Sequence, residues 1–439
     1  MQARWQNTFR ALAVRNFRLF ITGQLVSLLG GWIQTTAQDW LVLSLTHNSA
    51  TQLGYVASLQ FAPVLLLSLY GGTLADRIDK RRLLIIANSA YLVLAAGMGV
   101  LVLTGSVAVW HVMVFAACYG VVNSLETPTR QSFVSEMTGR DLLPNAIGLS
   151  SATFNSARII GPAIAGLLIA RWGTGLAFAI NALTFIAPIT AISRMRPSEL
   201  YREQRVGQIA AKEARIIDGF RYVRSRRDLL VPILLLLVVG MVGFNFQITL
   251  ALMAKNVFHA QADSFGLLTT SLAVGALIGA LASTTRKKRP AVWAVVLSAI
   301  SFGICEVLAG LAPTFAVMAL LLLPTGFSMV MYAQASNQRV QLGTGAAFRG
   351  RVMAIYALVF LGTTPIAAPI IGWIAATFGA RAAIWLGGVI SLVAALVTMI
   401  VEVRRTRSRV EVTFVPPRVV FRTPEPAAAA PAPLVEVSG

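Results

Sequence analysis

The amino-acid sequence predicts an all-α membrane protein with about twelve transmembrane helices in two pseudo-symmetric bundles of six. Three observations predict this fold class: the composition, the spacing of the apolar segments and an internal repeat. Hydrophobic residues make up 56% of the 439 residues and charged residues only 12%, whereas soluble proteins carry about 25% charged residues. Most of the chain therefore lies out of water, which excludes a disordered chain and a soluble cytosolic enzyme.

The apolar segments have the length that a membrane crossing requires, since a helix needs about 20 residues to span the hydrocarbon core. The first segment is too long for the apolar part of a signal peptide, so we expect it to stay as a membrane anchor. The predicted spans are residues 18–45, 52–75, 83–103, 108–127, 145–170, 174–194, 229–253, 264–285, 291–311, 314–336, 351–377 and 381–403.

The basic residues fall almost entirely on one side of these spans. With the N-terminus inside, 33 of the 37 Lys and Arg lie in inner segments, and the outer loops hold only Arg171, Lys255 and Arg381. Lys and Arg accumulate in cytoplasmic loops, so we expect both termini in the cytoplasm. The net charge of +20 is then spread over separate loops, which argues against nucleic acid as a partner.

A polar, strongly basic segment divides the chain into six spans and six spans. We expect an N-terminal six-helix bundle (1–193), a cytoplasmic central loop (194–228), a C-terminal six-helix bundle (229–403) and a disordered cytoplasmic tail (404–439) rich in Pro and Ala. The second half of the central loop has apolar and basic residues on opposite faces of a helix, which predicts a surface helix on the inner leaflet.

The two halves also repeat each other at an offset of 207 residues. Gly72-Thr-Leu-Ala-Asp76 then lies over Gly279-Ala-Leu-Ala-Ser283, each followed by a basic cluster, and Pro162 lies over Pro369. Parallel repeats of this kind imply a pseudo-twofold axis along the membrane normal and a cavity between the halves.

Several motifs carry a family resemblance. Segment 72–82, Gly-Thr-Leu-Ala-Asp-Arg-Ile-Asp-Lys-Arg-Arg, resembles the loop motif that the major facilitator superfamily has between its second and third spans. Segment 157–166, Ala-Arg-Ile-Ile-Gly-Pro-Ala-Ile-Ala-Gly, is similar to the antiporter motif of that superfamily, with Ala at two positions where Gly is usual. Further segments resemble the bacterial drug:proton antiporter group that includes the enterobactin exporter and macrolide-efflux proteins; they are 15–18, 34–40, 128–131, 143–146 and 349–353.

The resemblance implies the major facilitator fold and a secondary active transporter of the bacterial inner membrane. It implies export of a small amphipathic compound (a drug, macrolide or siderophore) by proton antiport through alternating access; the alternative is a flippase of the same fold for a lysophospholipid or another lipid. The expected partners are the bilayer, the small-molecule cargo and protons, with no cofactor or metal and a monomeric chain. The sequence has no HExxH, GxSxG or GxxxxGK[ST] motif, so we expect neither an enzyme nor a catalytic residue.

The loop motif predicts an inner gate. Gly72 opens the motif, and Asp76 ends the second span, where its carboxylate can accept N–H bonds from a helix N-terminus across the bundle interface. We expect Arg77 and Arg81 to pair with Glu126 at the inner end of the fourth span. Asp76 has no acidic counterpart in the second half of the repeat, which favours gating over simple anchoring of the loop.

The fifth span predicts close helix packing. Gly161 and Gly166 allow another helix to approach, and Pro162 removes one backbone donor and bends the helix. In the superfamily this motif is a seal between the halves; plain packing is the other interpretation, and the two are compatible.

Besides Glu402 at the end of the last span, three acidic residues lie within the spans, and proton coupling requires a buried carboxyl that titrates. Asp39 is the first candidate, with an ion pair to Arg158 or an outer-gate hydrogen bond as alternative roles. Glu306 is the second candidate, and Glu126 is assigned to the gate.

Polar residues at helical spacing form a stripe on the first span, and others face inward on later spans, because polar groups facing lipid are costly. Hydrogen bonding between helices is the alternative for each of them. The predicted cavity-lining residues are Gln34, Thr35, Gln38, Tyr119, Asn123, Asn155, Asn245, Gln247, Tyr332 and Gln334.

Overall fold

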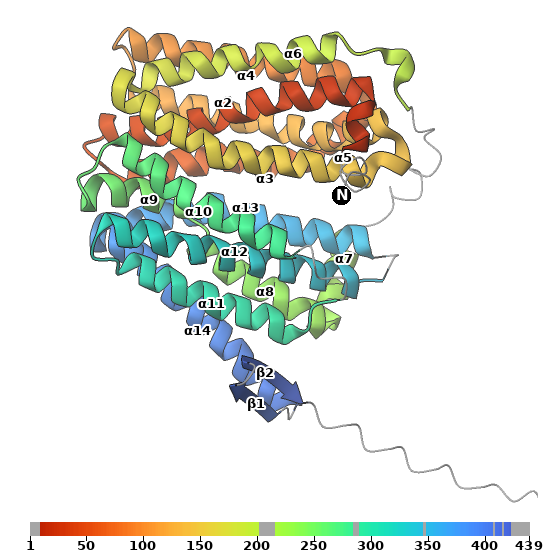
Figure 1. Cartoon of the computed structure of the whole chain (residues 1–439), viewed down its shortest axis with the longest axis vertical. Helices are drawn as coiled ribbons and strands as arrows, with labels where there is room; N and C mark the ends of the chain where they lie inside the picture. The colour runs from red at the N-terminus through yellow and green to blue at the C-terminus, as the bar shows by residue number, and fades with distance from the viewer. Residues whose placement is uncertain are drawn as a thin grey trace, which may run out of the picture.

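The computed structural model describes residues 9–201, 216–283, 289–345, 348–406, 409–414 and 417–422. Within these ranges only the backbone is described for residues 69–77, 140, 216–217, 406, 409–414 and 417–422. The described chain is mainly helical, and its long helices form two bundles that lie against each other (Figure 1).

The N-terminal bundle, red to yellow in Figure 1, follows the short 3-10 helix η1 (Arg10–Ala13). Its helices are α2 (Arg15–Leu45), α3 (Ala50–Arg77), α4 (Lys80–Leu103), α5 (Val109–Thr184) and α6 (Ile186–Ser193). Helix α5 turns sharply at Gly139 (φ 67°) and Gly173 (φ 77°), a backbone conformation that glycine adopts without the steric cost of a Cβ. Together with α6 it therefore supplies the fourth, fifth and sixth crossings.

The C-terminal bundle, green to blue, follows the 3-10 helix η2 (Pro197–Glu199) and the short helix α7 (Ile216–Ser225). It consists of α8 (Arg227–Val242), α9 (Phe246–Leu252), the π-helical turn η3 (Met253–Val257), α10 (Ala262–Ser283), α11 (Val292–Gly310), α12 (Phe315–Gly343), α13 (Arg349–Phe378) and α14 (Ala380–Thr406). Its first crossing is made by α8, α9 and η3 together, with a helix break at residues 243–245.

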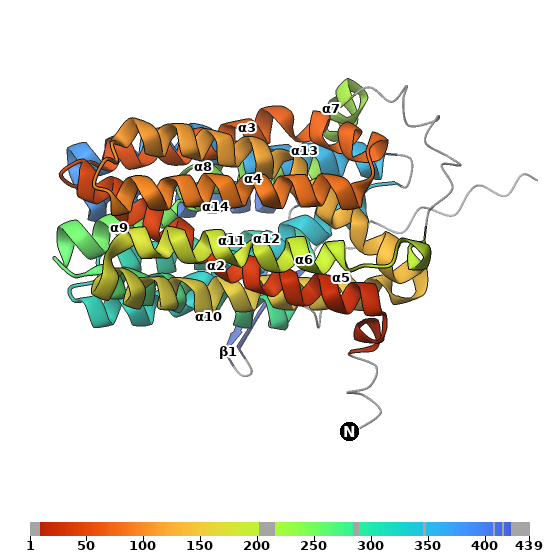
Figure 2. The same cartoon turned by 90° about the horizontal axis from the view of Figure 1, so that it is seen from above.

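These helices confirm the predicted fold class. Ten segments of the described chain are long and apolar enough to cross a membrane, and one of them, Asp141–Ser193, holds two crossings separated by the turn at Gly173. Helix α2 is more polar and is not among the ten, but its 31 residues run alongside the other helices (Figure 2). The described chain thus makes the twelve crossings that the sequence predicts.

The two ends of the bundles are named here by their charge. The basic end carries the turn between α3 and α4, the start of α8 and most of the described Lys and Arg. The opposite end carries the turns that follow α2, α4 and η3. Helix α2 begins at the basic end (Figure 2).

Two helix pairs, α3 with α13 and α5 with α10, hold the bundles together through close backbone contacts. A Cβ on Gly54 would lie 2.5 Å from the carbonyl oxygen of Ala368, and one on Gly166 would lie 2.8 Å from that of Ala262. Ser58 Oγ also donates to the carbonyl oxygen of Pro365 (2.6 Å). That carbonyl is free because Pro369, four residues later, has no N–H to offer it.

The central loop and the segment after the last span were predicted as a surface helix and a disordered tail, and the structure can be compared with both. Helix α7 lies within the predicted surface helix (210–228) and stacks the Tyr222 ring on Phe348, with centroids 4.3 Å apart. Helix α14 extends into the predicted disordered tail as far as Thr406, and strands β1 (Arg409–Phe414) and β2 (Pro417–Arg422) pair antiparallel beyond it. The structure therefore differs from the prediction over residues 404–406, 409–414 and 417–422, while residues 423–439 lie outside the described part.

Candidate functional site

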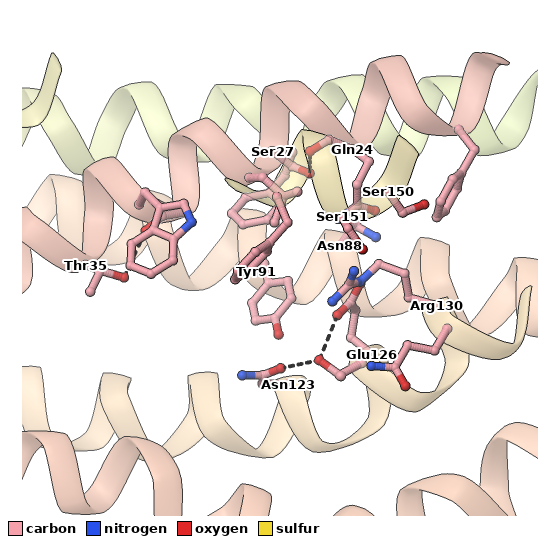
Figure 3. Close-up of a pocket in the computed structure, with 18 of the residues that line it drawn as sticks. Gln24, Ser27, Thr35, Asn88, Tyr91, Asn123, Glu126, Arg130, Ser150 and Ser151 are labelled. Carbon is pink, nitrogen blue, oxygen red and sulfur yellow. Dashed lines mark hydrogen bonds and ion pairs between the residues drawn. The ribbon is translucent and has the colours of Figure 1, made fainter. Parts of the chain in front are cut away.

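A cavity of about 780 Å³ lies within the N-terminal bundle, between α2, α3, α4 and α5 (Figure 3). Its volume is in the range of sites that hold drug-sized molecules. Its polar wall consists of Gln24, Ser27, Thr35, Gln60, Asn88, Asn123, Thr127, Gln131, Ser150, Ser151 and Asn155. Its aromatic wall consists of Phe20, Trp32, Phe61, Tyr91, Tyr119, Phe154 and Phe185. A wall of both kinds suits a molecule that has polar and aromatic parts.

An ion pair lies in this cavity near the basic end. Arg130 Nε donates to Glu126 Oε1 at 2.9 Å, one helical turn apart on α5. Thr127 Oγ1 lies 2.7 Å from Asn123 Oδ1 and extends the polar cluster along the same helix (Figure 3). Both charges belong to the cavity lining, so a polar guest can exchange hydrogen bonds with either of them.

Glu126 is thus engaged by Arg130, whereas the sequence predicts a pair with Arg81. Arg81 donates instead to the carbonyl oxygens of Ile192 (2.9 Å) and Ser193 (2.6 Å) at the end of α6. Unpaired carbonyls and the helix dipole make the C-terminus of a helix attractive to a guanidinium. Arg81 therefore joins α4 to α6 and does not reach the cavity.

The rest of the loop motif is described in its backbone only. The side chains of Gly72, Asp76 and Arg77 lie outside the described residues, so their predicted contacts remain predictions. In the adjoining turn, Asp79 caps α4 by accepting from the Arg82 amide (2.9 Å), and Lys80 pairs with Glu136 at 2.6 Å.

A second chamber, of about 320 Å³, lies between the two bundles. It shares Trp32, Thr35 and Phe154 with the larger cavity, and the Trp32 and Phe154 rings meet edge to face with centroids 5.9 Å apart. The C-terminal bundle contributes a mainly apolar wall: Phe244, Phe246, Gln247, Leu250, Phe265, Thr269, Leu272, Met329, Val330, Ala333 and Phe360.

Asp39 and Arg158 both line this chamber. Gln247 Nε2 of the C-terminal bundle donates to Asp39 Oδ1 at 3.3 Å, and Asp39 Oδ2 is buried with no hydrogen-bond partner among the described residues. No ion pair joins Asp39 to Arg158 in the described part of the chain; the carboxyl contacts an amide of the other bundle instead. The hydrogen bonds of a carboxyl between two bundles depend on how the bundles are positioned against each other.

Five of the predicted lining residues reach a cavity: Thr35, Tyr119, Asn123, Asn155 and Gln247.

Four others pack inside the bundles. Gln34 accepts from Asn181, and Gln38 donates to Gln60 at 2.8 Å. Asn245 bonds back to the Met241 carbonyl (2.9 Å), and Tyr332 is fully buried. Gln334, half-buried on α12, is not in either lining. For Gln34 and Gln38 the alternative of hydrogen bonding between helices is the one observed, whereas Asn245 bonds within its own segment.

Glu306 lies away from both cavities, inside the C-terminal bundle. It is 2% exposed, and its Oε2 has no hydrogen-bond partner in the described part of the chain. A Cβ on Gly243 would lie 3.0 Å from Oε2, and one on Gly387 would lie 3.2 Å from Oε1. The carboxyl therefore occupies space that two glycines leave open, next to the break between α8 and α9.

The packing motif of the fifth span lies close to two other helices, α2 and α10. A Cβ on Gly161 would meet the Cβ of Trp32, and Gly166 and the Pro162 carbonyl pack against the start of α10. Gly161 thus lets α5 approach α2 at the tryptophan that separates the two cavities.

Sequence reasoning missed Asn88, Tyr91 and Arg130 as cavity residues. Asn88 and Tyr91 are three residues apart in an otherwise apolar span, which places them on one helix face; that spacing is a signal that could have found them. Arg130 lies beyond the predicted end of the fourth span at residue 127, but α5 continues as a helix to residue 138 and places Arg130 beside Glu126.

Two pseudo-symmetric six-helix bundles, twelve crossings and a cavity that reaches the interface between the bundles define a multi-pass membrane transporter rather than an enzyme. The chain belongs to the transmembrane secretion effector family of the major facilitator superfamily, whose family model matches residues 6–424.

Three curated relatives are transporters or exporters. The chain is 26% identical to the multidrug efflux pump Tap of Mycolicibacterium fortuitum over 83% of this chain and 90% of that protein. It is 24% identical to the enterobactin exporter of Shigella boydii, over 89% and 93% of the two chains. It is 27% identical to the staphyloferrin A transporter of Staphylococcus aureus, over 60% and 66%.

Solved structures share the fold at low identity. A bacterial homologue of the lysosomal transporter Spinster, inward-facing and occupied, superposes with a TM-score of 0.71 at 13% identity, over 89% of this chain and 97% of that one. A D-xylose–proton symporter gives a TM-score of 0.67 at 16% identity, over 86% and 97%. These likenesses support the fold alone.

Proposed function

We propose that this transporter exports a small amphipathic compound, of the drug, macrolide or siderophore type, by proton antiport through alternating access. The observation that carries the proposal is the cavity pair: a polar and aromatic cavity joined at Trp32 and Phe154 to a chamber that holds Asp39 between the bundles. The cavity supplies the place for cargo, and the chamber supplies a titratable group at the moving interface.

The contacts between the bundles support alternating access. Hydrogen bonds between described residues of the two bundles involve Asp39, Ser44, Asn48, Ser58 and Ile159 of the N-terminal bundle. These five positions lie between the middle of the N-terminal bundle and the end opposite the basic end. The cavity residues Ile147 and Phe154 are 53% and 40% exposed, as expected of a cavity that opens toward the basic end.

Asp39 is the proposed proton site. A carboxyl at the interface, bonded to the other bundle by one oxygen only, changes its contacts with the facing bundle when it gains or loses a proton. Proton binding is thereby linked to how the two bundles are positioned against each other, and antiport requires such a link. Arg158 in the same chamber is the second member of the proposed coupling pair, since a nearby cation favours the ionised carboxyl.

The direction of transport and the orientation are proposed from two further observations. The multidrug pump and the enterobactin exporter, two of the relatives, are efflux proteins by name. The basic end gathers most of the described Lys and Arg, so it is the cytoplasmic end, with both termini inside the cell. We propose that the protein acts there as a monomer in the bacterial inner membrane.

The proposed orientation is tested by labelling. His47→Cys, in the turn at the opposite end, should react in intact cells with a membrane-impermeant maleimide in a background with Cys118→Ser and Cys305→Ala. Arg82→Cys at the basic end should react only after the cells are opened. The reverse pattern would contradict the orientation.

The proposed function is tested by efflux. Wild type, Asp39→Asn and the control Asp263→Asn, an exposed carboxyl at the opposite end, are expressed in an efflux-deficient bacterium. Accumulation of lipophilic dyes, macrolides and catechol siderophores is measured with and without an uncoupler. Wild type and the control should lower accumulation of at least one compound; Asp39→Asn and the uncoupler should abolish the effect. Export that survives Asp39→Asn would remove Asp39 from the coupling path, and a panel without any response would favour a lipid cargo.

A further inference from the structure

One segment of the C-terminal bundle contacts the N-terminal bundle through side-chain hydrogen bonds. Residues 246–257, which comprise α9 and η3 and are called the gate segment here, lie between the helix break at 243–245 and the turn at 258–261. Its first residues line the chamber beside Asp39, and its last residues reach the opposite end. The gate segment therefore extends from the chamber to the opposite end of the bundle.

Its described hydrogen bonds to the N-terminal bundle are made by side chains and run along α2 and the turn after it. Gln247 donates to Asp39 at 3.3 Å, Lys255 Nζ donates to Ser44 Oγ at 2.9 Å, and Asn256 Nδ2 donates to the Asn48 carbonyl at 3.4 Å. These contacts differ from the α3–α13 and α5–α10 pairs, where backbone approaches backbone at glycine.

Lys255 makes the shortest of these hydrogen bonds and also contacts an aromatic ring. Its ammonium lies 4.8 Å from the centroid of the Trp40 ring, which also stacks on Phe265 at 6.4 Å with an interplanar angle of 17°. An ammonium over an indole is a favourable electrostatic pair, strongest with tryptophan. Trp40 is adjacent to Asp39 in the chain, so Lys255 binds the helix turn that carries the proposed proton site.

The two kinds of contact have different consequences when the bundles move. Close backbone packing at glycine is lost entirely if helices separate, so the α3–α13 and α5–α10 pairs suit a pivot. Ser44 and Asn256 are already exposed, so water can replace their partners at little cost. The far end of the gate segment is fixed to its own bundle, because Arg381 lies over the Phe258 ring at 5.7 Å and Phe315 meets that ring edge to face at 5.8 Å.

We propose that the gate segment closes the chamber toward the opposite end and that Lys255, held on Trp40 and Ser44, is the residue that keeps it closed. This inference rests on the alternating access of the proposed function and assigns the closing contact to named residues. When Lys255 leaves Trp40, the α2 contacts of residues 246–257 are exchanged for water and the bundles separate at this end.

The test measures the separation of the bundles without cargo. Spin labels are placed on Ser106→Cys and Thr377→Cys, exposed sites at the opposite end of the two bundles, in a background with Cys118→Ser and Cys305→Ala. Distance distributions are recorded by double electron–electron resonance in lipid nanodiscs. Lys255→Met should raise the population ratio of the longer to the shorter distance about two- to fivefold, and Lys255→Arg, which keeps the cation, should leave it near the wild-type value.

Arg171→Met is the control, because it removes an exposed cation at the same end that lies outside residues 246–257 and their contacts with α2. It should leave the distribution unchanged. An unchanged distribution in Lys255→Met, or an equal shift in both variants, would overturn the proposal. If Lys255→Met does not give monodisperse protein, Trp40→Leu removes the same contact from the other side and is judged by the same two outcomes. No cargo is needed, so failure of the efflux experiment and failure of this inference are distinguishable.

Discussion

The two bundles share a fold but present different surfaces to the space between them. At the 207-residue offset, Asn88, Asn123, Glu126 and Ser151 of the cavity wall correspond to Val295, Val330, Ala333 and Leu358. The N-terminal bundle therefore supplies most of the polar groups and the ion pair, and the C-terminal bundle supplies apolar wall and the gate segment. The two halves therefore share the helix packing and differ in the residues that line the space between them.

The largest expected effect concerns the packing that the halves have in common. A Cβ on Gly275 of α10 would meet the carbonyl oxygen of Leu323, so Gly275→Val must push α12 away. We expect a destabilisation of about 3 kcal/mol or more and little monodisperse protein in size-exclusion chromatography. Gly97→Val, at a site with no neighbour within 4 Å, is the control and should purify as wild type does. Equal yields would show that the C-terminal bundle is less tightly packed than described.

The second prediction removes the ion pair that only the N-terminal half of the repeat carries. Arg130→Gln leaves the Glu126 carboxylate, 9% exposed, without its cation in the cavity wall, and we expect efflux to fall about tenfold or more. Efflux rates are compared with those of Arg82→Gln, an exposed cation at the basic end. Unchanged efflux in Arg130→Gln would place the pair outside the cargo path.

The third prediction separates hydrogen bonds of the bundle interior from those of the cavity wall. Gln34→Leu leaves Asn181 buried without its partner, which should cost about 1–3 kcal/mol of stability and lower the midpoint of thermal unfolding, with the cargo profile unchanged. The double variant Gln34→Leu/Asn181→Leu should recover much of the loss, because both partners become apolar. A changed cargo profile would return Gln34 to the cavity wall.

The smallest effect is expected from making the halves more alike. Val330→Asn gives the C-terminal bundle the side chain that its counterpart Asn123 provides in the N-terminal bundle. The new amide lines the small chamber, so we expect a change of about threefold or less in apparent cargo affinity, seen as a shift in the efflux profile toward more polar dyes. A loss of efflux comparable to that of Arg130→Gln would contradict the unequal division of roles.

The sequence predicted the fold well because membrane crossings depend on composition and length, which are local properties. The positions of Thr35 and Asp39 followed from helical spacing, since a polar stripe must face away from lipid. The exceptions have physical reasons. Gln34 shares the stripe but meets Asn181, 147 residues away in the chain, and Arg81 meets the end of α6 rather than Glu126. Such pairings depend on helix rotation and packing, which periodicity does not determine.

The buried carboxyl of Glu306 has a consequence for how the protein is made. Its carboxyl lies against Gly243, just after α8, and against Gly387 of α14, and α14 leaves the ribosome after α11. Until α14 is in place, one side of this carboxyl lacks its native cover, and a charged acidic group at the centre of a membrane helix costs about 2.5–3.5 kcal/mol. A chain that ends before α14 therefore keeps a polar group in the bilayer, the kind of signal by which membrane quality control distinguishes unfinished chains from assembled ones.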